Sequence, residues 1–188
     1  MALRFDGRDL HPAELGYLRA GASGAVAATA AGLSARRLVT VLRDRRMIAV
    51  EPAPPADATP LEAAVHGALR SPVGLGDMRS IRGVASELAQ LEARLIDSRL
   101  LAPRRRGLGG IVDAVRGRRT AAGEELFQSL RTRHADLKPG RYRAAWNAAE
   151  PHQVAMSVAL YGPEALFALR PMTQPGSFRR SSVNGEAV

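Results

Sequence analysis

The spacing of apolar residues changes partway through the first quarter of the chain. Residues 12–19 (PAELGYLR) and 23–35 (SGAVAATAAGLSA) carry apolar positions at helical spacing and are separated by Gly21. Residues 38–52 (LVTVLRDRRMIAVEP) instead contain two β-branched runs around a charged turn. Because a period of about 3.6 residues indicates a helix and a period of about 2 indicates a strand, this region predicts two helices followed by a hairpin.

The start of the next helix is marked by a capping sequence. After a Pro/Ala linker at 53–58, Thr59 is placed to bond the amide of Glu62, whose carboxylate can reach back, and a proline takes the first helical position. This pattern predicts a helix over 60–69. We expect a short helix at 74–81 to follow it.

A longer helix is expected over 83–101. Its apolar stripe consists of Val84, Leu88, Leu91, Leu95 and Ile96. The strongly basic segment 103–117 has the composition of a long turn, so residues 99–120 predict a second hairpin. Residues 118–130 (RRTAAGEELFQSL) place a threonine before apolar positions at helical spacing, which predicts a closing helix.

The two regions follow the same order of helix, helix and hairpin. We therefore expect an α+β chain that is mainly helical, built from tandem winged-helix-like units over 10–55 and 59–132. A C-terminal helical element is expected at 150–171, and a disordered tail at 172–188. The side chains expected to anchor the C-terminal element on the core are Val158, Leu166 and Leu169.

The composition narrows the classes of protein to which this chain can belong. Hydrophobic residues make up 46% of it but aromatic residues only 4%, so leucine, valine and alanine must fill the core. Cysteine is absent, which excludes disulfides, Cys-ligated zinc, iron–sulfur clusters and thiol catalysis and favours a cytoplasmic location. No apolar run approaches the roughly 18–20 residues that span a bilayer, so we expect no membrane span.

The net charge is strongly positive. Over its 188 residues the chain has a formal charge of +9, and Lys138 is its single lysine, so arginine supplies almost all of the cations. This charge favours an anionic partner such as nucleic acid, an acidic peptide or a membrane surface. Abundant alanine and arginine also fit a high-GC genome, so part of the arginine excess has an explanation in codon usage.

The arginines gather beside the two predicted hairpins rather than on the helices. A solvated basic surface and an anion-binding edge built from both hairpins explain this arrangement about equally well. The second interpretation assigns peptide or anion binding to Arg43, Arg45, Arg46, Arg104, Arg105, Arg106, Arg116, Arg118 and Arg119.

No catalytic or metal-binding pattern emerges from the sequence. The four histidines lie far apart and lack ligand-type neighbours at metal-like spacing. We expect surface or helix-start positions for His11, His66, His134 and His152. The adjacent Glu124 and Glu125 point in different directions around a helix and cannot act as an acid and base pair. The glycines at 107–110 lack the Gly-Lys-Ser/Thr ending of a phosphate loop. We therefore predict no enzymatic activity, no cofactor and no bound metal.

Sequence-specific reading of DNA is poorly supported. The second helix of a helix-turn-helix pair needs polar side chains that reach base edges. The candidate at 23–35 offers only Thr29 and Ser34. The candidate at 83–101 places carboxylates, which repel phosphates, beside two arginines. These residues are Glu87, Glu92, Asp97, Arg94 and Arg99. The hairpin arginines could still hold a nucleic-acid backbone nonspecifically.

Four segments carry a resemblance to a known family. They are AELGYLRAG (13–21), RLIDSRLLAPRRR (94–106), GRRTAAGEELFQSLR (117–131) and VAMSVALYGPEALFAL (154–169). As a set they resemble a poorly characterised actinobacterial domain family of about this length. Many of its members are membrane proteins with a Gly-rich C-terminal tail, often encoded beside multinuclear non-heme iron oxidases that modify ribosomal peptides. This sequence departs from those members, since it shows neither the membrane segment nor the long tail.

The resemblance implies a role beside a peptide-modifying enzyme. Small winged-helix domains in such systems hold an acidic leader peptide as a strand added to the hairpin edge. The chain is therefore expected to be a non-enzymatic adaptor that binds a partner enzyme or its acidic precursor peptide. The alternative is a DNA-binding winged-helix regulator. Changes at Arg104, Arg105 or Arg118 should weaken peptide binding, whereas DNA binding should depend on Arg94 or Arg99.

Overall fold

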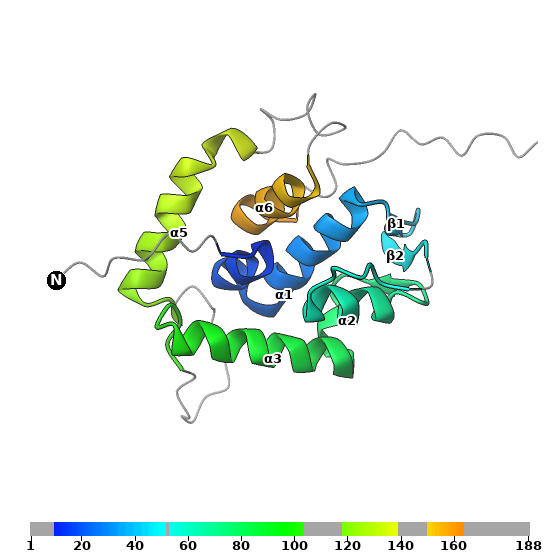
Figure 1. The fold of residues 1–188 in the computed structure, drawn as a ribbon, viewed down its shortest axis with the longest axis horizontal. Helices are drawn as coiled ribbons and strands as arrows, with labels where there is room; N and C mark the ends of the chain where they lie inside the picture. Colours follow the sequence, from blue (N-terminus) through cyan, green and yellow to red (C-terminus); the bar gives the residue numbers. More distant parts are fainter. Residues whose placement is uncertain (1–9, 52, 104–117, 139–149, 164–188) are drawn as a thin grey trace, which may run out of the picture.

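Helices pack around one central helix, and a small antiparallel sheet lies at one end of the molecule (Figure 1). The computed structural model describes residues 10–51, 53–103, 118–138 and 150–163. Its helices are α1 (Pro12–Ala35), α2 (Pro60–Ala68), α3 (Arg82–Asp97), α5 (Ala121–Arg133) and α6 (Pro151–Tyr161). Two 3-10 turns are η1 (Met78–Ser80) and η2 (Ala135–Leu137), and the strands are β1 (Val39–Val41), β2 (Arg46–Ala49) and β3 (Val73–Gly74). The expectation of a mainly helical α+β chain is confirmed.

Helix α1 consists of two helical halves joined by a sharp bend. Ala20 and Gly21 have non-helical backbone angles, and Gly21 has a φ of 66°, which a residue with a side chain rarely adopts. The bend brings the halves so close that a Cβ built on Gly24 would overlap the carbonyl oxygen of Gly16. The two predicted helices at 12–19 and 23–35 are therefore present as the two halves of α1.

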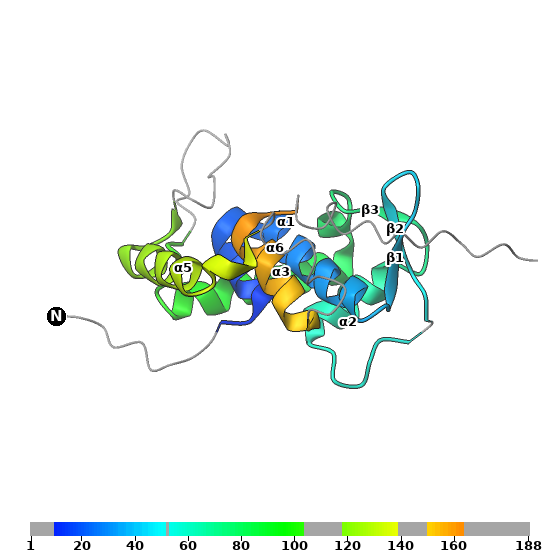
Figure 2. The same ribbon diagram turned by 90° about the horizontal axis from the view of Figure 1, so that it is seen from above.

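The second half of α1 is the centre of the fold. Every residue from Gly24 to Leu33 is buried. Helix α6 lies along it, as Figure 2 shows, and α2, α3, α5 and β1 also contact α1. A helix that is surrounded by other elements is apolar on all of its faces. Its small alanine side chains let the neighbouring backbones approach closely.

The predicted hairpin at 38–52 is confirmed. Strands β1 and β2 pair antiparallel with Val39 opposite Ala49 and Val41 opposite Met47. Strand β3 pairs with the other edge of β2, which gives the order β1-β2-β3. The expectation of a helix over 74–81 is wrong at its start, because residues 73–74 form β3 and only η1 is helical. Glycines at two positions in this stretch make a continuous helix costly.

The two middle helices begin and end as local sequence signals specify. Thr59 Oγ1 accepts a hydrogen bond from Glu62 N at 3.3 Å, and Glu62 Oε2 accepts one from Thr59 N at 2.8 Å, which confirms the capping box of α2. Four residues of the predicted apolar stripe of α3 are buried, and the fifth, Ile96, is partly buried. Helix α3 ends at Asp97, earlier than expected, because Arg99 has a left-handed φ of 58° and turns the chain.

The expected second hairpin is described at its base. Leu101 and Arg119 form an antiparallel bridge, and Ala102 N donates to Arg118 O at 2.7 Å. Residues 104–117, which contain the expected turn, lie outside the described part of the chain. Helix α5 then begins after Thr120, whose hydroxyl accepts from Gly123 N at 3.0 Å, so the predicted closing helix is confirmed.

Helix α6 joins the C-terminal part of the chain to the core. Val158 is fully buried, as expected, whereas Leu166 and Leu169 lie outside the described residues. The hydroxyl of Ser157 donates to Leu137 O at 2.7 Å, which ties α6 to η2. Tyr161 also donates to the carbonyls at the end of α5.

One large apolar cluster runs through both of the expected units, and a smaller one lies between α1 and α6. One cluster of buried side chains includes residues from the first unit, the second unit and α6. Its members include Leu18, Met47, Val65, Leu91, Phe127 and Leu160. The segments 10–55 and 59–132 therefore share their core in the folded chain.

One histidine departs from expectation. His66 was expected at the surface or at a helix start, but it is fully buried in the last turn of α2. Neither of its ring nitrogens has a hydrogen-bond partner in the described part of the chain. Burial of a polar ring without partners costs free energy, so this position lowers the stability of the core.

Replacement of His66 by leucine tests this cost. We expect His66→Leu to raise the free energy of unfolding by about 1–3 kcal/mol, because an apolar side chain of similar size needs no hydrogen bond. Urea unfolding followed by circular dichroism measures the change. His152→Leu, at an exposed position, is the control and should leave the stability within about 0.5 kcal/mol. A loss of stability in His66→Leu would contradict the prediction.

Candidate functional site

The turn between β1 and β2 displays three of the predicted anion-binding arginines. Arg43, Arg45 and Arg46 are all exposed. Asp44 accepts a hydrogen bond from Arg46 N at 3.1 Å and forms an ion pair with its guanidinium at 3.3 Å. Residues 43–46 contain three arginines and one aspartate, so the turn carries a net positive formal charge. It is the part of the expected basic edge that the structure describes at the surface.

Strand β1 forms an outer edge of the sheet. Val50 N donates to Leu38 O at 2.9 Å and Leu42 N donates to Arg46 O at 2.7 Å, so the even-numbered residues of this segment bond toward β2. Successive residues in a strand direct their main-chain groups to opposite edges, so the N–H and C=O of Val39 and Val41 face away from β2. Within the described ranges no strand pairs with this edge. The main-chain groups of Val41, a residue that is 40% exposed, can therefore bond to an added strand, whereas those of Val39 are buried.

Apolar surface accompanies this edge. Val41 is 40% exposed and Val50 is 60% exposed, and no other large hydrophobic side chain among the described residues is classed as exposed to this degree. Val39, two residues before Val41, is buried against the core. The edge of β1 thus combines unpaired main-chain groups, an accessible apolar side chain and a basic turn.

The structure places Arg118 inside the molecule rather than on a binding surface. Its residue is 5% exposed, and its Nη2 lies 2.7 Å from Glu92 Oε1. The same guanidinium donates to Ala102 O from Nε and Nη2, at 3.2 and 2.9 Å. Tyr17 donates its hydroxyl hydrogen to Glu92 Oε2 at 2.6 Å. Arg118 therefore holds the base of the second hairpin against α3 and α1.

Arg119 is also engaged within the chain. Its Nη1 lies 2.9 Å from Glu124 Oε2, and its guanidinium stacks over Phe127 with 4.7 Å to the ring centre. The side chain is 8% exposed. The remaining expected binding residues lie outside the described part of the chain. They are Arg104, Arg105, Arg106 and Arg116.

The candidate DNA-reading helices are poorly placed to enter a groove. Thr29, at the middle of the segment 23–35, is 3% exposed, because α6 and other elements cover this helix. On α3, Glu92 is committed to Arg118. Arg94 remains exposed but lies on a helix that also carries acidic side chains.

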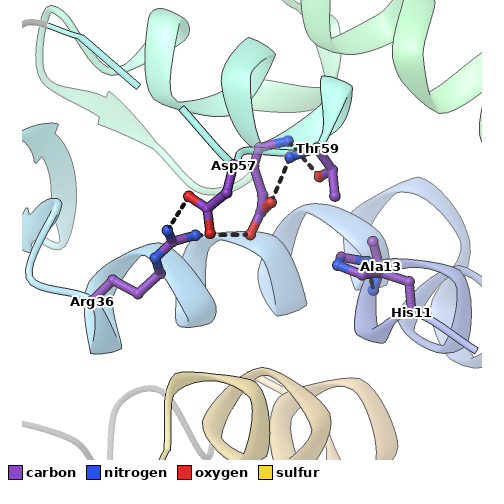
Figure 3. Close-up of polar contacts among 6 residues, drawn as sticks. His11, Ala13, Arg36, Asp57 and Thr59 are labelled. Carbon is purple, nitrogen blue, oxygen red and sulfur yellow. Dashed lines mark hydrogen bonds and ion pairs between the residues drawn. The ribbon is translucent and has the colours of Figure 1, made fainter. Parts of the chain in front are cut away.

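The sequence did not predict a cavity that the structure contains. It lies between the N-terminal ends of α1, α2 and α6 and is also lined by the second half of α1. Its volume is about 540 Å³. Figure 3 shows one wall, where Arg36 reaches from the end of α1 to Asp57. Glu62 lies 4.0 Å from the same guanidinium. The hydrogen bond from Arg36 holds the pKa of Asp57 below its usual range. These residues come from segments far apart in the chain, so no local sequence pattern predicts that they lie close together.

His11 caps α1 at the rim of this cavity. Its Nδ1 accepts a hydrogen bond from Ala13 N at 3.3 Å (Figure 3). Glu14 Oε2 accepts a hydrogen bond from His11 N at 3.0 Å. Burial lowers the pKa of His11, a shift that Glu62 and Glu14 oppose and His152 reinforces. The neutral ring is the form that can act as the cap.

No metal centre is found in the described segments, because no three His, Cys, Asp or Glu side chains gather closely enough to hold an ion there. His134 ends α5, and His152 lies in the first turn of α6. None of the helices that the structure describes is long and apolar enough to cross a bilayer.

No known protein family, no curated protein and no solved structure matches this chain. Its function is therefore inferred from the geometry of its own residues.

The ion pair between Arg118 and Glu92 should contribute strongly to stability. We expect Glu92→Leu to lower the free energy of unfolding by about 3–5 kcal/mol, because it leaves the buried guanidinium without its carboxylate. The double variant Glu92→Leu/Arg118→Met should recover most of this loss. Urea unfolding measures both changes, with Glu87→Leu as a control on the same helix. A small effect of Glu92→Leu would contradict the prediction, because it would mean that the guanidinium of Arg118 is solvated.

Stability should also depend on the titration of His11. Its folded pKa lies below the ordinary value of 6.5, so the unfolded chain binds protons first as the pH falls. The contribution of His11 is therefore present above about pH 6.5 and is lost as the pH falls below it. Asparagine caps helices well and does not titrate, so His11→Asn should flatten this part of the profile. Urea unfolding at several pH values tests this, and identical profiles for the two proteins would contradict it.

Proposed function

We propose that this chain is a non-enzymatic binding protein that takes an acidic, extended peptide as an added strand along β1. The observation that carries the proposal is the exposed residue Val41, whose main-chain groups face away from β2 beside the basic turn. Main-chain hydrogen bonds supply affinity in this mode of recognition and are indifferent to sequence. Selectivity for an acidic segment comes from Arg43, Arg45 and Arg46, which attract it electrostatically.

The same charges act against the wrong partner. An exposed strand edge is a template for pairing with another copy of the chain. Two copies meeting at this edge would bring two basic turns together, and like charges in such contact oppose association. An acidic peptide meets no such barrier.

A winged-helix-like arrangement is part of the proposal. Two features support it. Helix α1 leads through a left-handed Arg37, with a φ of 62°, into β1, and α3 leads through a left-handed Arg99 into the bridge at Leu101. In each case the residue after the arginine donates to a carbonyl five residues earlier, in the Schellman manner: Leu38 N to Leu33 O at 3.0 Å and Leu100 N to Leu95 O at 2.9 Å. The same type of helix ending before each β segment is consistent with a repeated helix and hairpin.

The resemblance noted in the sequence suggests the biological setting. A protein that holds an acidic precursor peptide beside a multinuclear iron oxidase would present the peptide to that enzyme, and we propose this adaptor role in the cytoplasm. A DNA-binding regulator remains the alternative outcome. The exposed arginines of the turn suit a phosphate backbone, but the burial of Thr29 and its neighbours removes the first candidate reading helix.

The edge is tested with one change at Val41. Proline at this position removes only an outward-facing N–H and leaves the bonds between β1 and β2 in place. We expect Val41→Pro to weaken binding of a fluorescent peptide of alternating Glu and Val about five- to tenfold, the worth of roughly one hydrogen bond. Val41→Thr, which keeps the N–H, should bind nearly as well as the original chain. Equal binding by both variants would overturn strand addition.

The charge contribution is tested separately. The triple variant Arg43→Ala/Arg45→Gly/Arg46→Ala should lose affinity for the acidic peptide, whereas Arg94→Ala on α3 should not. Glycine is used at Arg45 because its φ is 65°.

If the ligand is DNA, a duplex from the protein's own promoter should instead bind selectively at about 0.15 M salt. Its affinity should then fall with salt by a log–log slope of about 0.9 per phosphate contacted. That result would replace the adaptor with the regulator.

A further inference from the structure

We infer that the cavity between α1, α2 and α6 is a binding site for a small organic cation, an ammonium group on a short aliphatic chain. The site lies apart from the edge of β1 and does not depend on the function proposed for that edge. Its volume of about 540 Å³ falls in the range of small-molecule sites.

Negative charge dominates the lining of the cavity. Asp57, Glu62 and Glu150 supply three carboxylates, and Arg36 supplies one guanidinium. Arg36 is bound to Asp57 and lies near Glu62, so it partly neutralises these two carboxylates. Glu150 is exposed and makes no ion pair with the other described residues. A local excess of carboxylates attracts cations to the cavity, although the whole chain has a formal charge of +9.

The walls of the cavity are smooth and apolar between these charges. Small side chains from α1 and α6 form them. They are Pro12, Ala13, Ala28, Gly32, Pro151 and Ala155. Such walls accept methylene groups, so an aliphatic chain can lie along them while its charged end reaches the carboxylates.

A buried hydroxyl lacks a partner at this place. Thr29 lines the cavity and is 3% exposed, and its Oγ1 has no hydrogen-bond partner in the described part of the chain. A buried polar atom left unbonded costs free energy, and a bound ammonium group would donate the missing hydrogen bond. Thr29 is therefore an unused acceptor in the same cavity as the carboxylates.

The lining favours a cation over an anion. The N-terminal end of α6 has no side-chain cap, and by itself such an end attracts anions. Glu150 occupies that end, however, and Asp57 and Glu62 face the same space. His11 adds no positive charge near pH 8, because burial lowers its pKa from 6.5. An anion would meet Glu150 and two further carboxylates that already engage the one guanidinium.

Calorimetric titration of the whole chain with 1,4-diaminobutane near pH 8 and low salt tests the site, with succinate as a dianion of similar length. We expect saturable binding of one diamine per chain and none of succinate. Thr29→Val keeps the shape and removes the hydroxyl, and it should lower the diamine affinity about tenfold. Glu150→Gln should also lower it, whereas Glu125→Gln on the exposed face of α5 should leave it unchanged.

A thermal melt separates ligand binding from a structural role of the hydroxyl. Without diamine, Thr29→Val should melt at a higher temperature than the original chain, because the unbonded polar atom is gone. With diamine, only the original chain should gain stability appreciably. A lower melting temperature of Thr29→Val without diamine would mean that the hydroxyl is bonded within the protein and would overturn the site. Absence of saturable diamine binding, binding of succinate in its place, or an equal loss in Glu125→Gln would also overturn it.

Discussion

The close approach of backbones around α1 is the constraint on which the rest of the structure depends. Gly16 and Gly24 touch across the bend at Gly21, and neither can carry a side chain without displacing the other. Beyond the bend, α6 packs closely enough that a Cβ on Gly32 would lie 3.4 Å from the Cβ of Ala155. A chain with few aromatic residues cannot fill a wide core, so it gains its dispersion contacts by bringing helices together over small residues. The position of the sheet and the shape of the cavity both follow from this packing.

Local signals in the sequence predicted the elements well, and long-range pairings escaped them. The capping box at Thr59, the threonine before α5 and the hairpin at 38–52 are specified by neighbouring residues, which is why they could be predicted. Strand β3 could not, because its two residues become a strand only through pairing with Met47 and Arg46. The burial of His66 and the ion pair of Arg118 likewise depend on which helix faces which. The sharing of one core by both halves depends on α1 lying between them.

The arginines show why net charge is a weak guide to a binding surface. Some are exposed at a turn, as Arg43 is. Others, such as Arg37 and Arg99, adopt left-handed backbone angles that end a helix. Arg118 is buried in an ion pair, and Arg119 covers a phenylalanine ring. Composition counts all of these equally, but only those whose guanidinium groups reach solvent can attract a partner.

Hydrogen bonds between residues 99–102 and 118–120 close the base of the second hairpin. Ala102 N bonds to Arg118 O, Thr120 N bonds to Leu100 O at 3.2 Å, and Thr120 Oγ1 donates to Arg99 O at 2.6 Å. Since these contacts fix both ends, doubling the length of chain between them adds only about 0.6 kcal/mol of closure entropy. Sequences of very different length could therefore be inserted between residues 102 and 118, by evolution or by design, while the helical core remains the same.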